Sequence, residues 1–315
     1  FCSTLTRPPL PPRYARFLHA SFLKQELNQS RSRYCRLHIY LYCNALIHSV
    51  QTMAKAVLVT GGNAGIGFAL CRQLAVEHGC RVFMGARSIE RGESAAKSIR
   101  LPEGCDGSVE FVHLDVSLDV SVTAAAGAVA TRLLPGDQLY AIVNNAGVGF
   151  GSAATPEELL NINLYGPKRV CDAFVPLLNP TEGRIVNMGS DLGVTYVKEC
   201  PPDAQAFLSS TPESWEHIES WARGEHGLGS PSDDMGGYGV SKALLACYTL
   251  LCAKEKPDIT SSCVTPGLVD TKMTKGFGAT RTPEEATVGV RHCLFAKLEG
   301  NGLFYGTSGE RRTLS

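Results

Sequence analysis

One short pattern places a phenol and an ammonium group on the same side of a helix. Tyr238 and Lys242 are four residues apart at the start of a helical stretch, and residues with that spacing share a helical face. Tyrosine titrates near ~10, so proton exchange near neutral pH requires its pKa to fall by about three units, or ~4 kcal/mol. A lysine charge ~4 Å away, at an effective dielectric constant of ~20, supplies about that energy. The pair therefore predicts acid–base chemistry at Tyr238.

A glycine-rich segment, Thr60-Gly61-Gly62-Asn63-Ala64-Gly65-Ile66-Gly67, stands between an apolar run and a helical pattern. Glycines let the backbone turn sharply and approach a pyrophosphate. The helix that follows offers free N–H groups and the positive end of its dipole. The segment therefore predicts a dinucleotide-binding loop.

The residue that distinguishes NADP from NAD is expected about 20 residues after the last loop glycine. Arg87 stands at that place, and the next acidic residue is Glu90. An acid would accept hydrogen bonds from the ribose of NAD, whereas a guanidinium pairs with the 2′-phosphate of NADP. We therefore expect NADP(H) as the cofactor; the alternative is a solvated surface arginine.

Short apolar runs alternate with helix-length segments along the chain, and these elements must position the residues above. The apolar runs are residues 56–60, 81–85, 109–114, 139–144, 183–189, 259–265 and 302–305. The helical segments are residues 65–78, 89–100, 117–134, 156–178, 238–255 and 283–298. Nearly continuous apolar runs are typical of strands buried on both faces. The alternation predicts an α/β protein with a doubly wound parallel sheet, the Rossmann fold, in a single domain over residues 53–315.

Residues 191–237 interrupt the alternation before the Tyr238 helix, as a long insertion with a helical pattern at 212–221. Segments of this length inside a compact domain are usually functional. Trp215 and Trp221 lie on one stripe of that pattern. The insertion is either a packed excursion whose tryptophans fill space, or a lid over a substrate cleft.

Five motifs follow one another along the predicted β–α units. They are the loop 60–67, Asn144-Asn145-Ala146-Gly147, Ser190, the Tyr238/Lys242 pair and Pro266-Gly267. Together they resemble the classical short-chain dehydrogenases/reductases from residue 53 to about residue 307. Within that family the chain is most similar to the monomeric NADPH-dependent carbonyl reductases. The shared features are Thr-Gly-Gly-Asn in the loop, Ala86-Arg87, the long insertion, and Thr282-Pro283-Glu284-Glu285.

The resemblance implies a role for each catalytic residue. Tyr238 would protonate the carbonyl oxygen as hydride leaves the nicotinamide, and Ser190 would hydrogen-bond that oxygen. Lys242 would lower the Tyr238 pKa and bind the nicotinamide ribose, while Asn163 would support a water relay to Lys242. Ser241 is expected on the helix surface.

The resemblance also implies a cofactor site. Its members are Gly61, Asn63, Gly65, Ile66, Gly67, Arg87, Asp115, Asn144, Ala146, Gly147, Tyr238, Lys242, Pro266, Gly267, Val269 and Thr271. Asp115 would contact adenine, and Val269 and Thr271 would meet the nicotinamide amide. The chain departs from the related reductases at Ala64, where they often place a lysine, and at Leu268, where they tend to carry tryptophan.

Composition narrows the remaining function classes. The 315 residues carry 30 Lys/Arg and 30 Asp/Glu, so the formal net charge is zero. This balance gives no indication of a nucleic-acid partner. Twelve cysteines form no Cys-x-x-Cys pair and no cluster at zinc spacing, so we expect no metal site and buried cysteines in a reducing compartment.

Residues 1–52 are rich in arginine and contain one acidic residue, Glu26. They are read as an artefactual or untranslated stretch before Met53, an organelle transit peptide, or a structural extension. Their longest apolar run, 37–50, is shorter than the ~20 residues of a spanning helix. We expect a cytoplasmic protein without stable membrane insertion, unless 1–52 direct it to an organelle.

Three functions remain open. The first is NADPH-dependent reduction of a small aldehyde, ketone or quinone to an alcohol. The second is NADP-linked oxidation of a lipid-like alcohol such as a retinoid or steroid, and the third is a non-catalytic NADP-sensing protein. A monomer is expected, because in the resembling reductases the insertion packs over the helices of Asn163 and Tyr238.

Overall fold

The computed structural model describes residues 54–149, 155–228 and 234–314 of the chain. From Ala54 onward the chain forms one compact unit. The predictions for residues 1–52 lie outside the described residues. No helix of the described residues is both long and apolar enough to cross a membrane.

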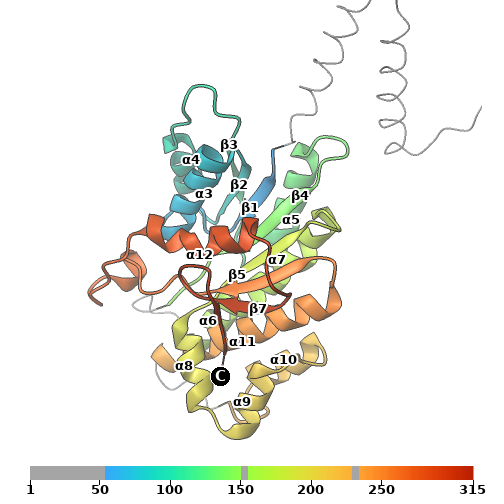
Figure 1. The fold of residues 1–315 in the computed structure, drawn as a ribbon, viewed down its shortest axis with the longest axis vertical. Helices are drawn as coiled ribbons and strands as arrows, with labels where there is room; N and C mark the ends of the chain where they lie inside the picture. Colours follow the sequence, from blue (N-terminus) through green and yellow to red (C-terminus); the bar gives the residue numbers. More distant parts are fainter. Residues whose placement is uncertain (1–53, 150–154, 229–233, 315) are drawn as a thin grey trace, which may run out of the picture. The chain divides into compact units, whose positions relative to one another are not determined.

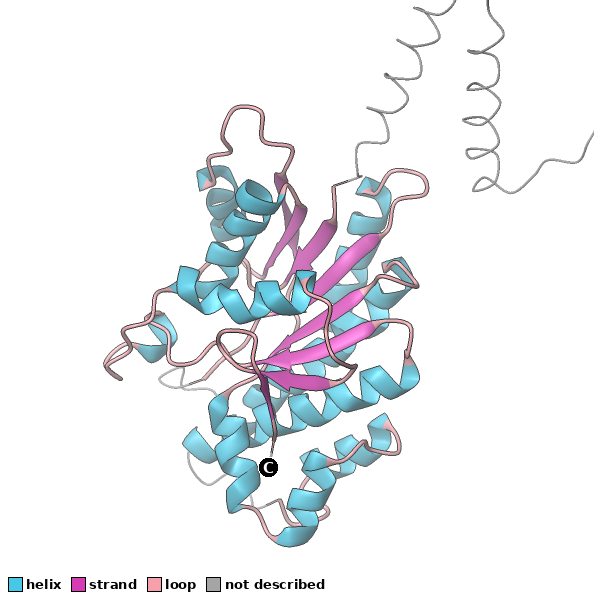
Figure 2. Ribbon diagram, viewed as in Figure 1, coloured by secondary structure: helices cyan, strands magenta, loops and turns pink. Residues whose placement is uncertain are grey.

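Eight strands form a single sheet in the order β3-β2-β1-β4-β5-β6-β7-β8 (Figures 1 and 2). The strands are β1 (Ala56–Val59), β2 (Arg81–Ala86), β3 (Ser108–His113), β4 (Leu139–Asn144), β5 (Arg184–Met188), β6 (Thr260–Val264), β7 (Leu303–Tyr305) and β8 (Arg311–Arg312). All neighbours pair in parallel except β7 and β8. The strand order reverses between β1 and β4, and ligands of such sheets bind where it reverses. The predicted doubly wound α/β fold is confirmed.

Helices cover both faces of the sheet (Figure 1). They are α3 (Gly65–His78), α4 (Ile89–Ser98), α5 (Asp119–Arg132), α6 (Pro156–Leu160), α7 (Gly166–Phe174), α8 (Asp191–Glu199), α9 (Pro202–Ser209), α10 (Trp215–Ala222), α11 (Asp234–Glu255) and α12 (Pro283–Phe295). Short turns of other helix types are η1 (Asn161–Tyr165), η2 (Val175–Leu177) and η3 (Lys272–Thr274). Along β1, Val57 and Val59 pack with α3 and α12, whereas Leu58 packs with α5, α7 and α11. This two-residue alternation is why the strands read as continuous apolar runs.

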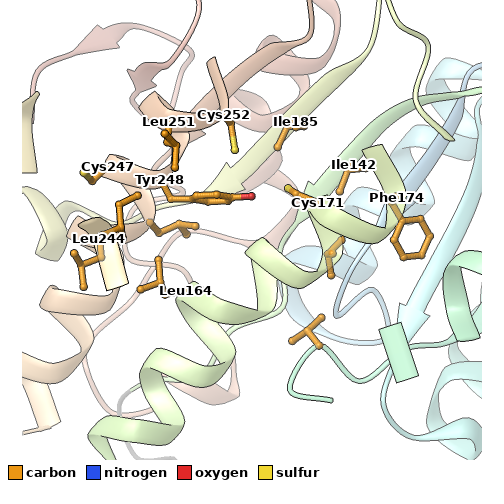
Figure 3. Close-up of a cluster of buried hydrophobic side chains, with 14 of the residues drawn as sticks. Ile142, Leu164, Cys171, Phe174, Ile185, Leu244, Cys247, Tyr248, Leu251 and Cys252 are labelled. Carbon is orange, nitrogen blue, oxygen red and sulfur yellow. The ribbon is translucent and has the colours of Figure 1, made fainter. Parts of the chain in front are cut away.

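The core between the sheet and α11 is centred on Tyr248, whose hydroxyl points toward Cys171 (Figure 3). Burial raises the pKa of Tyr248 and of the neighbouring Cys252 well above their ordinary values. The nine described cysteines are free, and all but Cys105 are buried, as expected for cysteines that act as small apolar residues.

Over its described residues 191–228, the insertion contains three helices, α8 to α10, of which the sequence pattern predicted only the last. The tryptophans of α10 pack into the core. The Trp215 ring centre lies 5.6 Å from that of Tyr165 and 5.5 Å from that of Tyr248. Trp221 stacks on Phe207 at 4.5 Å. These contacts fit the packed excursion rather than a lid formed by the tryptophans.

Other elements also differ from the predictions. The Tyr238 helix begins one turn earlier, at Asp234. The helix predicted over 156–178 is divided by a π-helical turn, η1, and such turns often occur at functional sites. The two-residue strand β8 has no apolar pattern from which it could be predicted.

Candidate active site

Two adjoining cavities lie at the carboxyl ends of the parallel strands. The larger, about 560 Å³, is lined by the segments that follow β1, β2, β3 and β4, and by residues 270–273. The smaller, about 420 Å³, is lined mainly by the segments that follow β4, β5 and β6 and by the start of α11. The shared lining residues are Ile66, Asn145, Gly147, Val148, Thr271 and Met273. The two cavities thus share a wall and form one candidate site.

Most of the predicted site residues line these cavities. In the larger cavity they are Gly61, Asn63, Gly65, Ile66, Gly67, Arg87, Asp115, Ala146, Gly147 and Thr271. In the smaller they are Ile66, Gly147, Ser190, Tyr238, Lys242, Pro266, Gly267, Val269 and Thr271. The predicted members that line neither cavity are Asn144 and Asn163.

The glycine-rich loop turns directly into α3. Gly61 and Gly65 have positive φ, 63° and 53°, which favours glycine. A Cβ on Gly67 would lie 2.4 Å from the Nδ2 of Asn145, so packing also requires glycine there. The N-cap residue Ala64 makes no side-chain capping bond, and the first turn of α3 contains no acidic residue. This helix end is suited to an anion.

Thr60 and Asn145 join the loop after β1 to the loop after β4; both lie in the motifs quoted above, but neither was predicted as a site residue. The Thr60 hydroxyl accepts from the backbone N–H groups of Asn145 at 3.0 Å and Ala146 at 2.9 Å. The Asn145 side-chain amide donates to the carbonyls of Thr60 at 2.8 Å and Gly61 at 3.2 Å. The sequence feature that could have indicated them is a polar residue at or just after the end of a buried strand.

Asn144 lies in the core instead of lining the cofactor cavity. It is the last residue of β4 and pairs in register with Asn187 of β5. Its amide donates to the Oδ1 of Asn187 at 2.8 Å, and Asn187 in turn donates to the Thr249 hydroxyl at 2.9 Å. Because strand residues alternate between faces, the following residue, Asn145, reaches the cavity instead.

Ser190, Tyr238 and Lys242 meet at the smaller cavity. Ser190 follows β5 and caps α8, accepting from the N–H of Leu192 at 3.2 Å. Tyr238 is buried, and its hydroxyl is hydrogen-bonded to Ser190. The Lys242 Nζ donates to the carbonyl of Met188 at 2.8 Å and lies 5.5 Å from the centre of the Tyr238 ring. Hydroxyl, phenol and ammonium therefore border one space.

Burial has the largest effect on the pKa values of Tyr238 and Lys242. It raises the pKa of Tyr238 to about 12, opposed by the Ser190 hydrogen bond. Burial also lowers the pKa of Lys242 to about 8. The prediction of a lowered Tyr238 pKa is therefore wrong for the protein alone, because the cost of burying a phenolate exceeds the help of neighbouring groups. Tyr238 is protonated at neutral pH.

Asn163 and Ser241 form a buried support behind the cavity wall. The Asn163 side chain exchanges two hydrogen bonds with the backbone of Val148, both 2.9 Å, and donates to the Ser241 hydroxyl at 3.0 Å. That hydroxyl donates to the carbonyl of Tyr238 at 2.8 Å. Ser241 is fully buried, so its predicted surface position is wrong. A Cβ on Gly147 would lie 3.2 Å from the Asn163 Oδ1 and 3.6 Å from the Lys242 Nζ, so all three are neighbours.

Comparison with known proteins identifies relatives across most of the chain. Residues 55–202 match the family model described as short chain dehydrogenase. The chain is 33% identical over 289 residues to (+)-neomenthol dehydrogenase of Arabidopsis thaliana, covering 80% of this chain and 95% of the relative. It is 34% identical over 254 residues to carbonyl reductase (NADPH) 1 of Homo sapiens, covering 72% and 86%. The structure of salutaridine reductase from Papaver somniferum matches with a TM-score of 0.67 at 28% identity, covering 80% and 99%. The chain is therefore an oxidoreductase that belongs to the short-chain dehydrogenase/reductase family.

Proposed function

We propose that the protein reduces the carbonyl group of an aldehyde, ketone or quinone to an alcohol, with NADPH as the hydride donor. The observation that carries this proposal is the convergence of Ser190, Tyr238 and Lys242 on a cavity that adjoins the glycine-rich loop. The name of the human relative, carbonyl reductase (NADPH) 1, supports both the reaction and the cofactor.

The larger cavity suits the adenosine and pyrophosphate portions of a nicotinamide dinucleotide, whose nicotinamide would extend into the smaller cavity beside Tyr238 and Val269. The uncapped α3 N-terminus, free of acidic residues, would hold the pyrophosphate at Gly65, Ile66 and Gly67. Exposed Arg87 lines the same cavity after β2 and would pair with the 2′-phosphate of NADP. Asp115 would contact adenine; its carboxylate is held by the backbone and hydroxyl of Ser117 at 3.0 and 2.6 Å.

The chemistry that the cofactor supplies when bound is a hydride from its nicotinamide ring. Tyr238 donates a proton to the carbonyl oxygen, since its raised pKa keeps it protonated at neutral pH. Ser190 donates a hydrogen bond to the same oxygen and stabilises the negative charge that develops there. The protonated amine of Lys242 stabilises the tyrosinate left after proton transfer. The Tyr238 pKa thus favours reduction, because alcohol oxidation would need the phenolate as a base.

The smaller cavity favours a small, uncharged substrate. Leu192, Leu268, Met273 and Phe277 form much of its wall. Asp191 also borders it, and its carboxylate is neutralised by an ion pair with Arg312 of β8. Apart from Lys242, which the proposed reaction employs, the described residues of the wall offer a charged substrate no unpaired partner to replace its lost hydration.

A screen of carbonyl compounds tests the proposal. NADPH consumption, followed by absorbance, is measured with aliphatic and aromatic aldehydes, ketones and quinones, and the reverse reaction with NADP⁺ and retinoid or steroid alcohols. We expect turnover of at least one carbonyl class. NADPH binding without turnover of any compound would contradict the proposal and favour a sensor, and turnover of alcohols alone would reverse the direction.

We also propose that the protein is a monomer and that residues 53–315 are its catalytic domain. Helix α10 packs on α11, and Trp215 contacts Tyr165 of η1, so the insertion covers the helices of Tyr238 and Asn163. Light scattering on the purified protein tests the oligomeric state, and a dimer or tetramer would contradict it.

A further inference from the structure

Lys272 is held at the mouth of the larger cavity by a short, hydrogen-bonded turn. It is the first residue of η3 and is exposed. The backbone N–H of Thr271 donates to the Thr274 hydroxyl at 3.1 Å, and that hydroxyl donates to the carbonyl of Val269. Threonine bonds on both sides of the turn therefore fix the backbone from which the lysine side chain extends.

The turn lies against the N-terminus of α3. A Cβ on Gly65 would lie 3.4 Å from the Cγ2 of Thr271, which is van der Waals contact. Lys272 lines the same cavity as Gly65 and the N-cap residue Ala64. One side of this space thus presents the positive end of a helix dipole, and a lysine extends from the turn beside it.

The charges that border the cavity divide into two groups. The cations are Arg87 and Lys272, and among the described residues neither forms an ion pair with a carboxylate. The acids are Asp115, whose carboxylate is occupied by Ser117, and the exposed Asp270. Two unpaired cations at separate places in one cavity suit a ligand with two separate phosphate groups.

We propose that the Lys272 ammonium binds the pyrophosphate of the dinucleotide, while Arg87 binds the 2′-phosphate. This inference rests on the proposed NADPH function and goes beyond it, because it assigns each cation to a different phosphate. Lys272 supplies the positive charge that the alanine at position 64 does not. A pyrophosphate carries charge common to NAD and NADP, so Lys272 contributes affinity without contributing the preference between them.

Binding of cofactor fragments separates the two roles. ADP-ribose carries the pyrophosphate without a 2′-phosphate, and adenosine 2′-monophosphate carries the 2′-phosphate without a pyrophosphate. Dissociation constants for both fragments and for NADPH are measured by calorimetry on the wild type, Lys272→Met and Arg87→Gln. The matched control is Lys275→Met, which removes an exposed lysine from a position that lines neither cavity.

We expect Lys272→Met to weaken ADP-ribose and NADPH by about five- to tenfold, the loss of one partly solvated charge-assisted contact. Its affinity for adenosine 2′-monophosphate should stay at the wild-type value, as should all affinities of Lys275→Met. Arg87→Gln should weaken NADPH and adenosine 2′-monophosphate and spare ADP-ribose. Thermal unfolding of each variant shows that the fold is intact.

Two results would overturn the assignment. Unchanged binding of ADP-ribose and NADPH by Lys272→Met would show that the lysine does not contact the pyrophosphate. A loss confined to ligands with a 2′-phosphate would move Lys272 to the adenosine end. If the wild type bound no NADPH at all, the proposed function would fall together with this inference; if only the variant comparison failed, the proposed function would stand.

Discussion

Replacing Lys242, the lysine of the proposed catalytic group, should make the protein more stable as well as inactive. Lys242 is 5% exposed, and burial lowers its pKa from 10.5 to about 8. A difference of about 2.5 pH units corresponds to a cost of about 3 kcal/mol for holding the charged amine inside the fold at neutral pH. Lys242→Met removes that cost. It also removes the 2.8 Å hydrogen bond from the ammonium to the Met188 carbonyl, a loss of about 1.5 kcal/mol for a bond with a charged donor.

The net expectation is a gain of about 1.5 kcal/mol in the free energy of unfolding, or roughly 3–6 °C in Tm. The sign with pH follows from the two pKa values. The folded pKa lies below the unfolded one, so the unfolded chain binds more protons between about pH 8 and 10.5, and wild-type stability rises over that window. The advantage of Lys242→Met should be largest below about pH 8 and should shrink toward pH 10.

Urea unfolding of wild type and variant at several pH values measures this difference, with the exposed Lys275→Met as the control that should show no gain. A Lys242→Met protein that is less stable than wild type at neutral pH would refute a destabilising effect of the buried charge. A gain that stays constant as the pH rises would also refute it, because the benefit would then not come from the buried charge.

Three other predictions concern cofactor choice, support of the site and pH. Arg87→Asp should shift the ratio of kcat/KM for NADPH and NADH toward NADH, and unchanged NADPH affinity would defeat the assignment of the 2′-phosphate contact. Ser241→Ala removes the hydroxyl that accepts from the Asn163 amide at 3.0 Å. We expect kcat to fall about tenfold with KM nearly unchanged, which corresponds to a loss of ~1.4 kcal/mol of transition-state stabilisation; equal kcat in variant and wild type would contradict a positioning role. The rate of reduction should decline above about pH 8 as Lys242 loses its proton, while Tyr238 stays protonated toward pH 12; a flat profile from pH 7 to about 10 would contradict this order of titration.

Elements with strong local signals could be predicted closely from the sequence. Helix α3 and strand β4 begin and end where the apolar pattern placed them. Strand β4 lies in the centre of the sheet, where burial on two faces leaves a continuous apolar run, and α3 packs on one face of the sheet through Leu70 and Leu74. Helices α8 and α9 and strand β8 were missed, because they are short and are stabilised by packing against distant segments instead of by a pattern of their own.

Polar networks could not be derived in the same way, because their partners are far apart in sequence. Thr60 and Asn145 are 85 residues apart, and Asn163 and Ser241 are 78 apart. The sequence around Ser241 does not indicate that the π-helical turn η1 places the Asn163 amide within hydrogen-bonding distance of its hydroxyl. The Tyr238 pKa was misjudged for a related reason: the sequence shows the helping lysine, but the depth at which both groups are buried emerges only from the assembled fold.

Tyr238→Phe tests whether Tyr238 delivers the proton to the substrate oxygen, the step on which the proposed reaction depends. The substitution removes one oxygen and keeps the ring that packs in the cavity wall. Single-turnover reduction is measured for a carbonyl compound that the wild type accepts, with NADPH binding measured separately by fluorescence. We expect the variant to bind NADPH and to lose at least about a hundredfold in rate. A variant that reduces the carbonyl at the wild-type rate would show that the Tyr238 hydroxyl is not the proton donor.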